Sequence, residues 1–249
     1  MKSQHDDRSV KHWETRPEAA WKGFRFNPPY AQGRSRLQEE VLSKTNFDPS
    51  TLWQWGTMQA MAVIEILKTV EKEFGREGQQ VVLESLYRVG YDVGRQATEG
   101  TSIPEDMTTT EWMSFYATVM NRIAYASLES PRVVNDKLVN FHIDWCPHQD
   151  IYKPMDCRVQ RYFVQGMLDA AADFLKSQGR EIVWDLVVQT TIPAGSETCF
   201  FEIEQGDPAA PRKWIEYTRL LEKKALEIAK KERLAKKPRK RLLGGCGFP

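Results

Sequence analysis

The chain has no long hydrophobic run and no apolar segment of secretory type at its start. Polar or charged residues break each apolar stretch before it reaches the ~20 residues that a membrane-spanning helix needs. The first 24 residues, "MKSQHDDRSVKHWETRPEAAWKGF", contain no apolar core of the kind that directs export. We therefore expect no membrane span and a cytoplasmic protein.

Cysteine is scarce. The 249 residues include four cysteines, Cys146, Cys157, Cys199 and Cys246. In a cytoplasmic chain of this size four thiols do not make a disulfide framework. Three roles remain open for them, as packed core thiols, reactive thiols or metal ligands.

Most of the chain has no excess of basic residues, because the excess is confined to the C-terminal segment. The formal net charge is +1, but from Arg212 onward 13 Lys and Arg stand against 4 Glu, so the preceding 211 residues carry an excess of eight negative charges. The basic residues of the tail are available to contact an acidic partner, a membrane surface or nucleic acid. A solvated helix explains them more simply, and no nucleic-acid-binding motif is found elsewhere.

The hydrophobic pattern predicts an α+β fold with a helical N-terminal layer on an antiparallel sheet. Apolar residues recur at helical spacing through residues 55–74, 77–97 and 109–128, with Trp112 and Ile123 facing inward. After Pro131 the period changes to two, which indicates a strand to about residue 146. A helix from Asp156 and a hairpin within residues 181–204 follow.

Three segments are expected along the chain. Residues 1–50 are rich in turn formers and predict an irregular arm, with a short helix near residues 36–43. Residues 51–210 form a single α+β domain. Residues 211–249 form a basic helical tail whose end, beyond Pro238, is disordered.

Two stretches carry a resemblance to a known family. "DWCPHQDIYKPMDC" and "AGSETCFFEIE" contain Trp145-Cys146-Pro147, then Cys157, then Gly195 followed by Cys199. In this arrangement the chain resembles the L-2-amino-thiazoline-4-carboxylic acid hydrolase-like family. The C-terminal half is also similar to vinyl-reductase-type domains, small modules that bind small molecules or metals. The resemblance implies hydrolytic opening of a cyclic amidine and a meeting of the three cysteines.

Candidate catalytic residues follow from the strand and from the helix after it. If the strand stays regular to its end, His142, Asp144 and Cys146 share its polar face, about 6 to 7 Å apart at each step of two residues. Cys157 lies at the start of a helix, where the positive end of the helix dipole favours a thiolate and lowers the pKa. Cys157 is therefore the preferred nucleophile, although a packed core thiol explains it equally well.

Two kinds of chemistry suit this set of residues. In one, Cys157 or Cys146 attacks a C=N or carbonyl carbon, His142 or His148 moves the proton, and an aspartate such as Asp144 orients the imidazole. The enzyme would then be a hydrolase acting on a C–N bond. In the other, a protein without catalysis binds a small molecule or a metal, and zinc and iron suit such ligands. The metal ligands would be Cys146, His148, Cys157 and Cys199.

Further polar and aromatic residues are expected to bind the substrate. Arg161 lies one turn beyond Cys157, so its guanidinium is placed to bind a substrate carboxylate. Asp185 interrupts an apolar strand, Cys199 is expected at the pocket floor, and Trp145 lies at the strand exit. The expected partner is a small molecule, and a homo-oligomer is left open.

Overall fold

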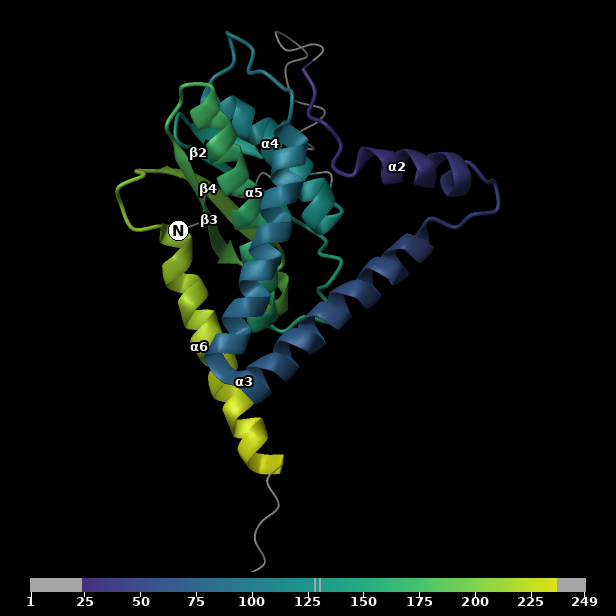
Figure 1. Cartoon of the computed structure of the whole chain (residues 1–249), viewed down its shortest axis with the longest axis vertical. Helices are drawn as coiled ribbons and strands as arrows, with labels where there is room; N and C mark the ends of the chain where they lie inside the picture. Colours follow the sequence, from purple (N-terminus) through teal and green to yellow (C-terminus); the bar gives the residue numbers. More distant parts are fainter. Residues whose placement is uncertain (1–23, 128, 130, 237–249) are drawn as a thin grey trace, which may run out of the picture.

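The computed structural model describes residues 24–127, 129 and 131–236. It shows an α+β fold in which helices cover a four-stranded antiparallel sheet (Figure 1). The predicted fold class is confirmed at this level.

The sheet has the order β1-β2-β4-β3. Its strands are β1 (Arg132–Asn135), β2 (Leu138–Ile143), β3 (Val183–Thr190) and β4 (Cys199–Gly206). Alternate residues of β2 and β4 are buried, and Phe141 pairs with Phe201 across the two strands. The predicted hairpin is present as β3 and β4. The strand predicted to run to about residue 146 ends at Ile143.

Along the described part of the chain, four helical segments precede β1 and the other four follow β2. They are α2 (Ala31–Leu37), the π-helical η1 (Gln38–Leu42), α3 (Ser50–Thr98), α4 (Thr109–Tyr125), the 3-10 turns η2 (Pro154–Cys157) and η3 (Ile192–Ala194), α5 (Arg158–Ser177) and α6 (Lys213–Lys236). Helix α4 begins after Thr108, whose hydroxyl accepts the Glu111 N–H at 3.2 Å while the Glu111 carboxylate accepts the Thr108 N–H at 2.9 Å. This reciprocal cap fixes where the helix starts.

Helix α3 reverses direction at Gly75, which has a positive φ of 64°. Glycine adopts this conformation without the steric penalty of other residues. Figure 1 shows the first half of α3 running out from the body toward α2, and the second half running beside α5. The first half, with α2 and η1, forms an outward arm, so the segment predicted to be irregular before residue 51 is helical over residues 31–42.

The core lies between the sheet and the two helices α4 and α5. Trp112, Leu168, Trp184 and Ile203 are all buried there. The helical layer against the sheet therefore includes α5 from the C-terminal half as well as the N-terminal α4. Helix α3 packs outside α5 as a further layer.

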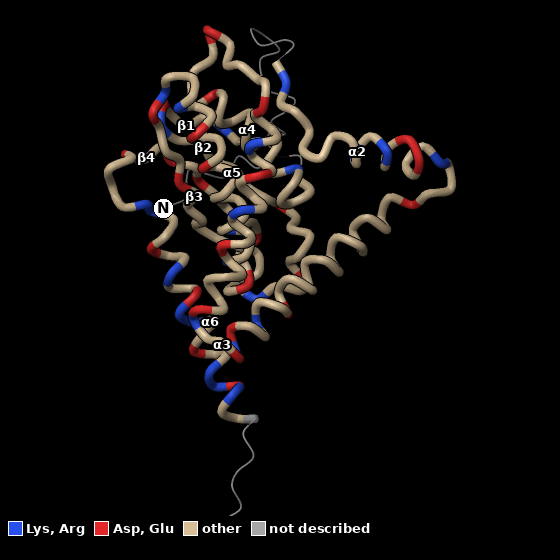
Figure 2. The backbone as a smooth tube through the Cα atoms, viewed as in Figure 1, with Lys and Arg blue, Asp and Glu red and all other residues tan. Residues whose placement is uncertain are grey.

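Helix α6 lies against α3, α5 and β3, so the helical part of the basic tail packs on the body. Lysines and arginines alternate with glutamates along it (Figure 2). The Tyr162 hydroxyl donates to the Glu222 carboxylate at 2.6 Å, and the buried Gln79 amide donates to the Glu222 carbonyl at 3.2 Å. The predicted disordered end lies outside the described residues. Within the part of the chain that the structure covers, no helix has the length and apolarity that crossing a membrane requires.

Helices α3 and α5 approach so closely that their backbones touch. A Cβ atom on Gly90 would lie 1.9 Å from the Phe163 carbonyl oxygen, and one on Gly166 would lie 2.2 Å from the Tyr87 carbonyl oxygen. Neither position has room for a side chain, because both obstacles are backbone atoms. The two glycines therefore set the distance between the helices.

We expect Gly90→Ala to destabilise the protein by roughly 1–3 kcal/mol, because the added methyl group forces α3 and α5 apart. The matched control is Gly56→Ala in the same helix, where nothing lies within 4 Å of the added Cβ. That control should raise stability by about 0.5–1 kcal/mol through better helix propensity. Urea unfolding followed by circular dichroism measures both, and equal effects would refute the close-approach argument.

Candidate functional site

Three cysteines that are far apart in the sequence line one small cavity. Cys146, Cys157 and Cys199 border a space of about 20 Å³, which is about the room that one water molecule needs. The other lining residues are Tyr125, His148, Tyr152, Gln160, Arg161, Val188, Thr191, Pro193 and Phe201. The convergence implied by the family resemblance is therefore present in the fold.

Local structure brings each cysteine to this cavity. Cys199 is the first residue of β4 and pairs with Ile143 on the buried face of the sheet. Cys146 follows β2 in a loop, where its N–H donates to the Gln149 side-chain oxygen at 3.1 Å. Cys157 ends the η2 turn directly before α5.

A buried ion pair fixes the start of α5. The Arg158 guanidinium donates to both carboxylate oxygens of Glu71, at 2.7 and 2.8 Å, and both side chains are almost fully buried. The Asp156 carboxylate accepts the Lys153 N–H and pairs with Lys68 at 3.1 Å. Asp156 was expected to cap α5, but it instead holds the preceding turn, and Cys157 occupies the cap position without a side-chain bond.

The thiols are protonated at neutral pH. Burial raises the pKa of Cys157 from its ordinary value of 9.0 to about 12, and the neighbouring Cys146 and Cys199 add to the rise. Burial likewise raises the pKa of Cys199 to about 11 and raises that of Cys146. The expectation that the helix dipole lowers the pKa of Cys157 is wrong, because the loss of solvation outweighs the effect of the dipole.

Arg161 is a buried cation without a carboxylate partner among the described residues. It is 5% exposed, its guanidinium lies 4.6 Å from the ring centre of Tyr217, and its Nε has no hydrogen-bond partner. Burial lowers the pKa of Arg161, but an arginine at neutral pH keeps its charge. Within the described residues, the positive charge at this cavity therefore has no carboxylate counter-ion.

His148 lines the same cavity and has a ring nitrogen without a partner among the described residues. The residue is 8% exposed, its ring stacks on Tyr152 with centroids 4.7 Å apart, and its Nδ1 is buried without a hydrogen-bond partner. Burial lowers the pKa of His148, so the imidazole is neutral at pH 7 and able to accept a proton.

His142 and Asp144 do not reach the cavity. Because β2 ends at Ile143, the face shared by alternate residues does not continue to Cys146. His142 lies on the other face of the strand from Phe141, with its Nδ1 2.9 Å from the Thr198 hydroxyl and its ring stacked on Phe200. Asp144 is exposed. The geometry thus favours His148 over His142 as the proton acceptor.

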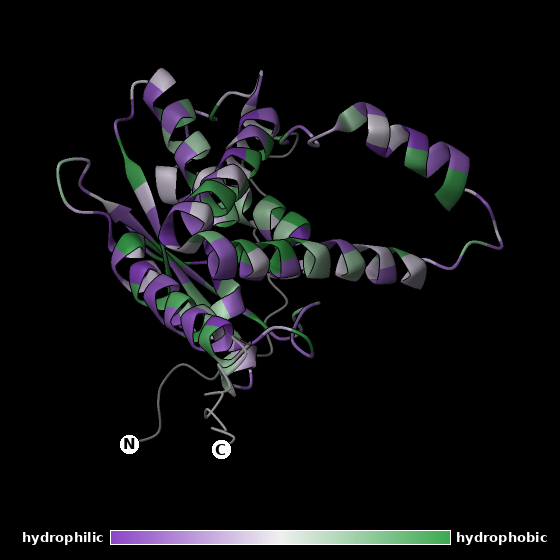
Figure 3. Ribbon diagram, turned by 60° about the horizontal axis from the view of Figure 1, so that its bottom comes forward, coloured by the Kyte–Doolittle hydropathy of each residue, from purple (hydrophilic) through white to green (hydrophobic). Residues whose placement is uncertain are grey.

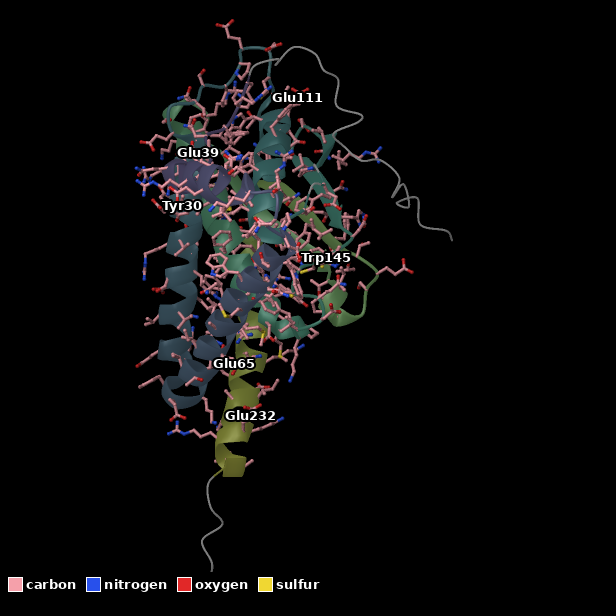
Figure 4. The ribbon with its side chains drawn as sticks, turned by 90° about the vertical axis from the view of Figure 1, so that its right-hand side faces the viewer. Tyr30, Glu39, Glu65, Glu111, Trp145 and Glu232 are labelled. Atoms are coloured by element: carbon pink, nitrogen blue, oxygen red, sulfur yellow. The ribbon has the colours of Figure 1, made fainter. Side chains whose placement is uncertain are left out.

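Asp185 also lies away from the cavity lining. Its carboxylate pairs with Arg212 at 2.5 Å and accepts the Lys213 N–H at 2.8 Å, which anchors the start of α6 on β3. Of the four residues expected to bind substrate, Arg161 and Cys199 line the cavity. Trp145, labelled in Figure 4, is 49% exposed and lines a neighbouring groove instead.

This groove was not predicted from the sequence. It has a volume of about 580 Å³ and is lined by Pro49, Leu52, Trp53, Gly56, Thr57, Gln59, Ala60, Val63, Leu86, Ile123, Ala124, Ala126, Trp145, Pro147, His148, Tyr152, Val159, Gln160 and Phe163. No aspartate, glutamate, lysine or arginine is among them. Ile123, expected to face the core, is 40% exposed at its edge. One signal was available, since no charged residue occurs from residue 49 to 64.

Comparison with known proteins places the chain in a family. No family model matches it. It is 49% identical over 216 residues to an uncharacterized protein of Archaeoglobus fulgidus, an alignment that covers 86% of this chain and 95% of the archaeal one. The chain belongs to the same family as this archaeal protein. The shared family spans nearly the whole of the archaeal chain.

The donor atoms of the cavity suit zinc or iron in kind but not in placement. Thiols and an imidazole are soft ligands of the type these metals prefer. Among the residues described, however, no three His, Cys, Asp or Glu side chains are grouped closely enough to hold a metal ion.

We expect Cys157 to react slowly with iodoacetamide at pH 7 and about tenfold faster for each pH unit up to pH 9, because only the thiolate reacts. With a pKa of about 12 the thiolate fraction keeps rising through this range. Mass spectrometry of the Cys157 peptide measures the rate, and Cys157→Ala identifies the signal. A plateau with a midpoint below pH 8 would contradict the raised pKa.

Proposed function

We propose that this protein is a hydrolase-like enzyme that acts on a C–N bond of a small carboxylated heterocycle or amide. The reacting group would meet Cys157 and His148, and Arg161 would bind the carboxylate. One observation carries the proposal, the buried and uncompensated guanidinium of Arg161 beside the three thiols. The family resemblance of the cysteine segments points to the same chemistry.

A carboxylate is the ligand that this guanidinium lacks. Burying a cation without a counter-ion is unfavourable, and the cost is relieved when an anion accepts its hydrogen bonds. Arginine binds carboxylates in a planar, two-bond geometry. The Nε of Arg161 has no partner among the described residues, so at least one of these bonds is open to a ligand.

Because its pKa is raised, the Cys157 thiol would still carry its proton when it meets the substrate and would lose it during the attack. Because the thiol is protonated, its proton would pass to the neutral His148 as the sulphur bonds to the amidine or carbonyl carbon. The π electron pair moves to the heteroatom, and collapse of the adduct breaks a bond to the leaving atom, which takes the proton from His148. Water then releases the product from the sulphur and restores thiol and imidazole.

The rival function is binding without catalysis, as in the vinyl-reductase-type domains that the C-terminal half resembles. The observation that favours it is the smallness of the cavity, which at about 20 Å³ holds no substrate in its closed form. In either case the partner is a small molecule and a cytoplasmic setting is proposed. An acidic partner for the basic helix and a homo-oligomer remain further proposals.

We expect Arg161→Met to weaken binding of L-2-amino-thiazoline-4-carboxylate by about tenfold to a hundredfold, since it removes a charge-assisted hydrogen bond. Arg161→Lys should keep part of the affinity. Arg219→Met, at an exposed position of α6, is the matched control. Calorimetry measures binding, and carboxylate binding that is equal in all four proteins would overturn the assignment of Arg161.

We expect Cys157→Ser to retain carboxylate binding and to lose turnover, measured as formation of the carbamoyl product. Turnover that persists in this variant would remove Cys157 as the nucleophile. Elemental analysis of the purified protein decides the rival involving a metal. Stoichiometric zinc or iron that is lost in Cys157→Ala would overturn the free-thiol mechanism.

A further inference from the structure

The groove beside the cysteine cavity lies between the outward arm of α3 and the body of the protein. Residues 49–63 form one wall, and residues 123–126, 145–148 and 159–163 form the other. Figure 1 shows the arm diverging from the body, and Figure 3 shows apolar residues recurring along it. One wall therefore belongs to the body of the protein, and the other is the first part of α3, in which none of residues 50–63 is buried.

The groove and the cavity are neighbours. His148, Tyr152 and Gln160 line both of them. The cavity at about 20 Å³ has room for a water molecule, whereas the groove at about 580 Å³ lies within the usual size range of small-molecule sites. Of these two neighbouring spaces, only the groove has the volume for the body of a small-molecule ligand.

The lining of the groove selects an uncharged body. Trp53, Trp145 and Phe163 offer aromatic surface, and no side chain with a full charge at neutral pH borders the space. A charged group placed there would lose its hydration without gaining a partner. An apolar or aromatic group gains from leaving water.

Two residues that line the groove carry polar atoms without a partner among the described residues. The Thr57 hydroxyl oxygen and the His148 Nδ1 are buried and make no hydrogen bond within the described residues, and His148 is itself 92% buried, being 8% exposed. Buried polar groups in native proteins are nearly always satisfied. These two atoms, at separate points of the lining, therefore indicate a ligand that carries polar atoms on an otherwise apolar body.

We propose that the ligand is an amphipathic carboxylate, with an aromatic-sized apolar body in the groove and its carboxylate at Arg161. The carboxylate end rests on the proposed function. The groove end rests on the lining, the volume and the unpartnered atoms alone. The substrate would thus be larger and more apolar than a simple amino-acid-derived ring.

Three probes separate the two ends of the ligand. Propanoate carries the carboxylate alone, 3-phenylpropanoate carries both parts, and 3-phenylpropan-1-ol carries the apolar body without the charge. We expect 3-phenylpropanoate to bind at least about tenfold tighter than propanoate, because the phenyl group leaves water. Equal affinity of these two acids would overturn the inference.

A groove-filling variant tests the location. Nothing lies within 4 Å of a Cβ on Gly56, a helical glycine of the groove wall, so Gly56→Trp adds an indole at this wall without a backbone clash. Gly33→Trp is the matched control, since Gly33 is also helical, has equally open surroundings and lies outside the groove. We expect Gly56→Trp to weaken both phenyl probes about tenfold and to leave propanoate unchanged, with Gly33→Trp like the wild type.

The outcomes distinguish this inference from the proposed function. If the alcohol binds as tightly as the phenyl acid and Arg161→Met has no effect, while Gly56→Trp still blocks both, the groove site stands and the carboxylate site falls. If Gly56→Trp and Gly33→Trp bind the phenyl probes equally, the groove site falls. If sedimentation shows that Gly56→Trp changes the oligomeric state and not the affinity, a second copy of the chain covers the groove and the inference is overturned.

Discussion

The buried contact between Glu71 and Arg158 is the constraint on which the site depends. Removing either partner would leave a charge inside the protein, so the pair joins α3 to the first residue of α5 as a unit. The buried Gln79 amide adds a further bond to Glu71 at 2.7 Å. Cys157 directly precedes Arg158 and Arg161 follows one turn later, so the pair anchors the segment that carries both residues. The two arginines are both buried, but of the two only Arg158 has a carboxylate partner among the described residues.

Most of the fold could be predicted because its elements have strong local signals. The change of period after Pro131 predicted the strand region that contains β1 and β2. The two helical patterns over residues 55–74 and 77–97 match the two halves of α3 on either side of Gly75. The short helix expected near residues 36–43 overlaps the end of α2 and η1, but the start at Ala31 was missed, since neither α2 nor η1 contains a buried residue and thus neither has a clear apolar stripe.

The site was less predictable because it depends on tertiary structure. Alternate residues of a strand share a face, which predicted that His142 and Cys146 lie on the same side. The argument holds only while the strand continues, and β2 ends at Ile143. The dipole argument for Cys157 considered one local effect, and burial, which comes from segments distant in the sequence, reversed its sign. Arg161 was identified from its spacing alone, but its lack of a partner could be seen only in three dimensions.

The outward arm of α3 has a consequence for how the family can diversify. Its residues from Ser50 to Val63 include none that is buried, and Ile64 is the first that belongs to a core. Substitutions along this arm therefore reshape one wall of the groove at little cost in stability, while the cysteines and Arg161 stay fixed by the body. Under the proposed function, changes in this single helix would alter which ligand the groove accepts and would leave the residues around the thiols as they are.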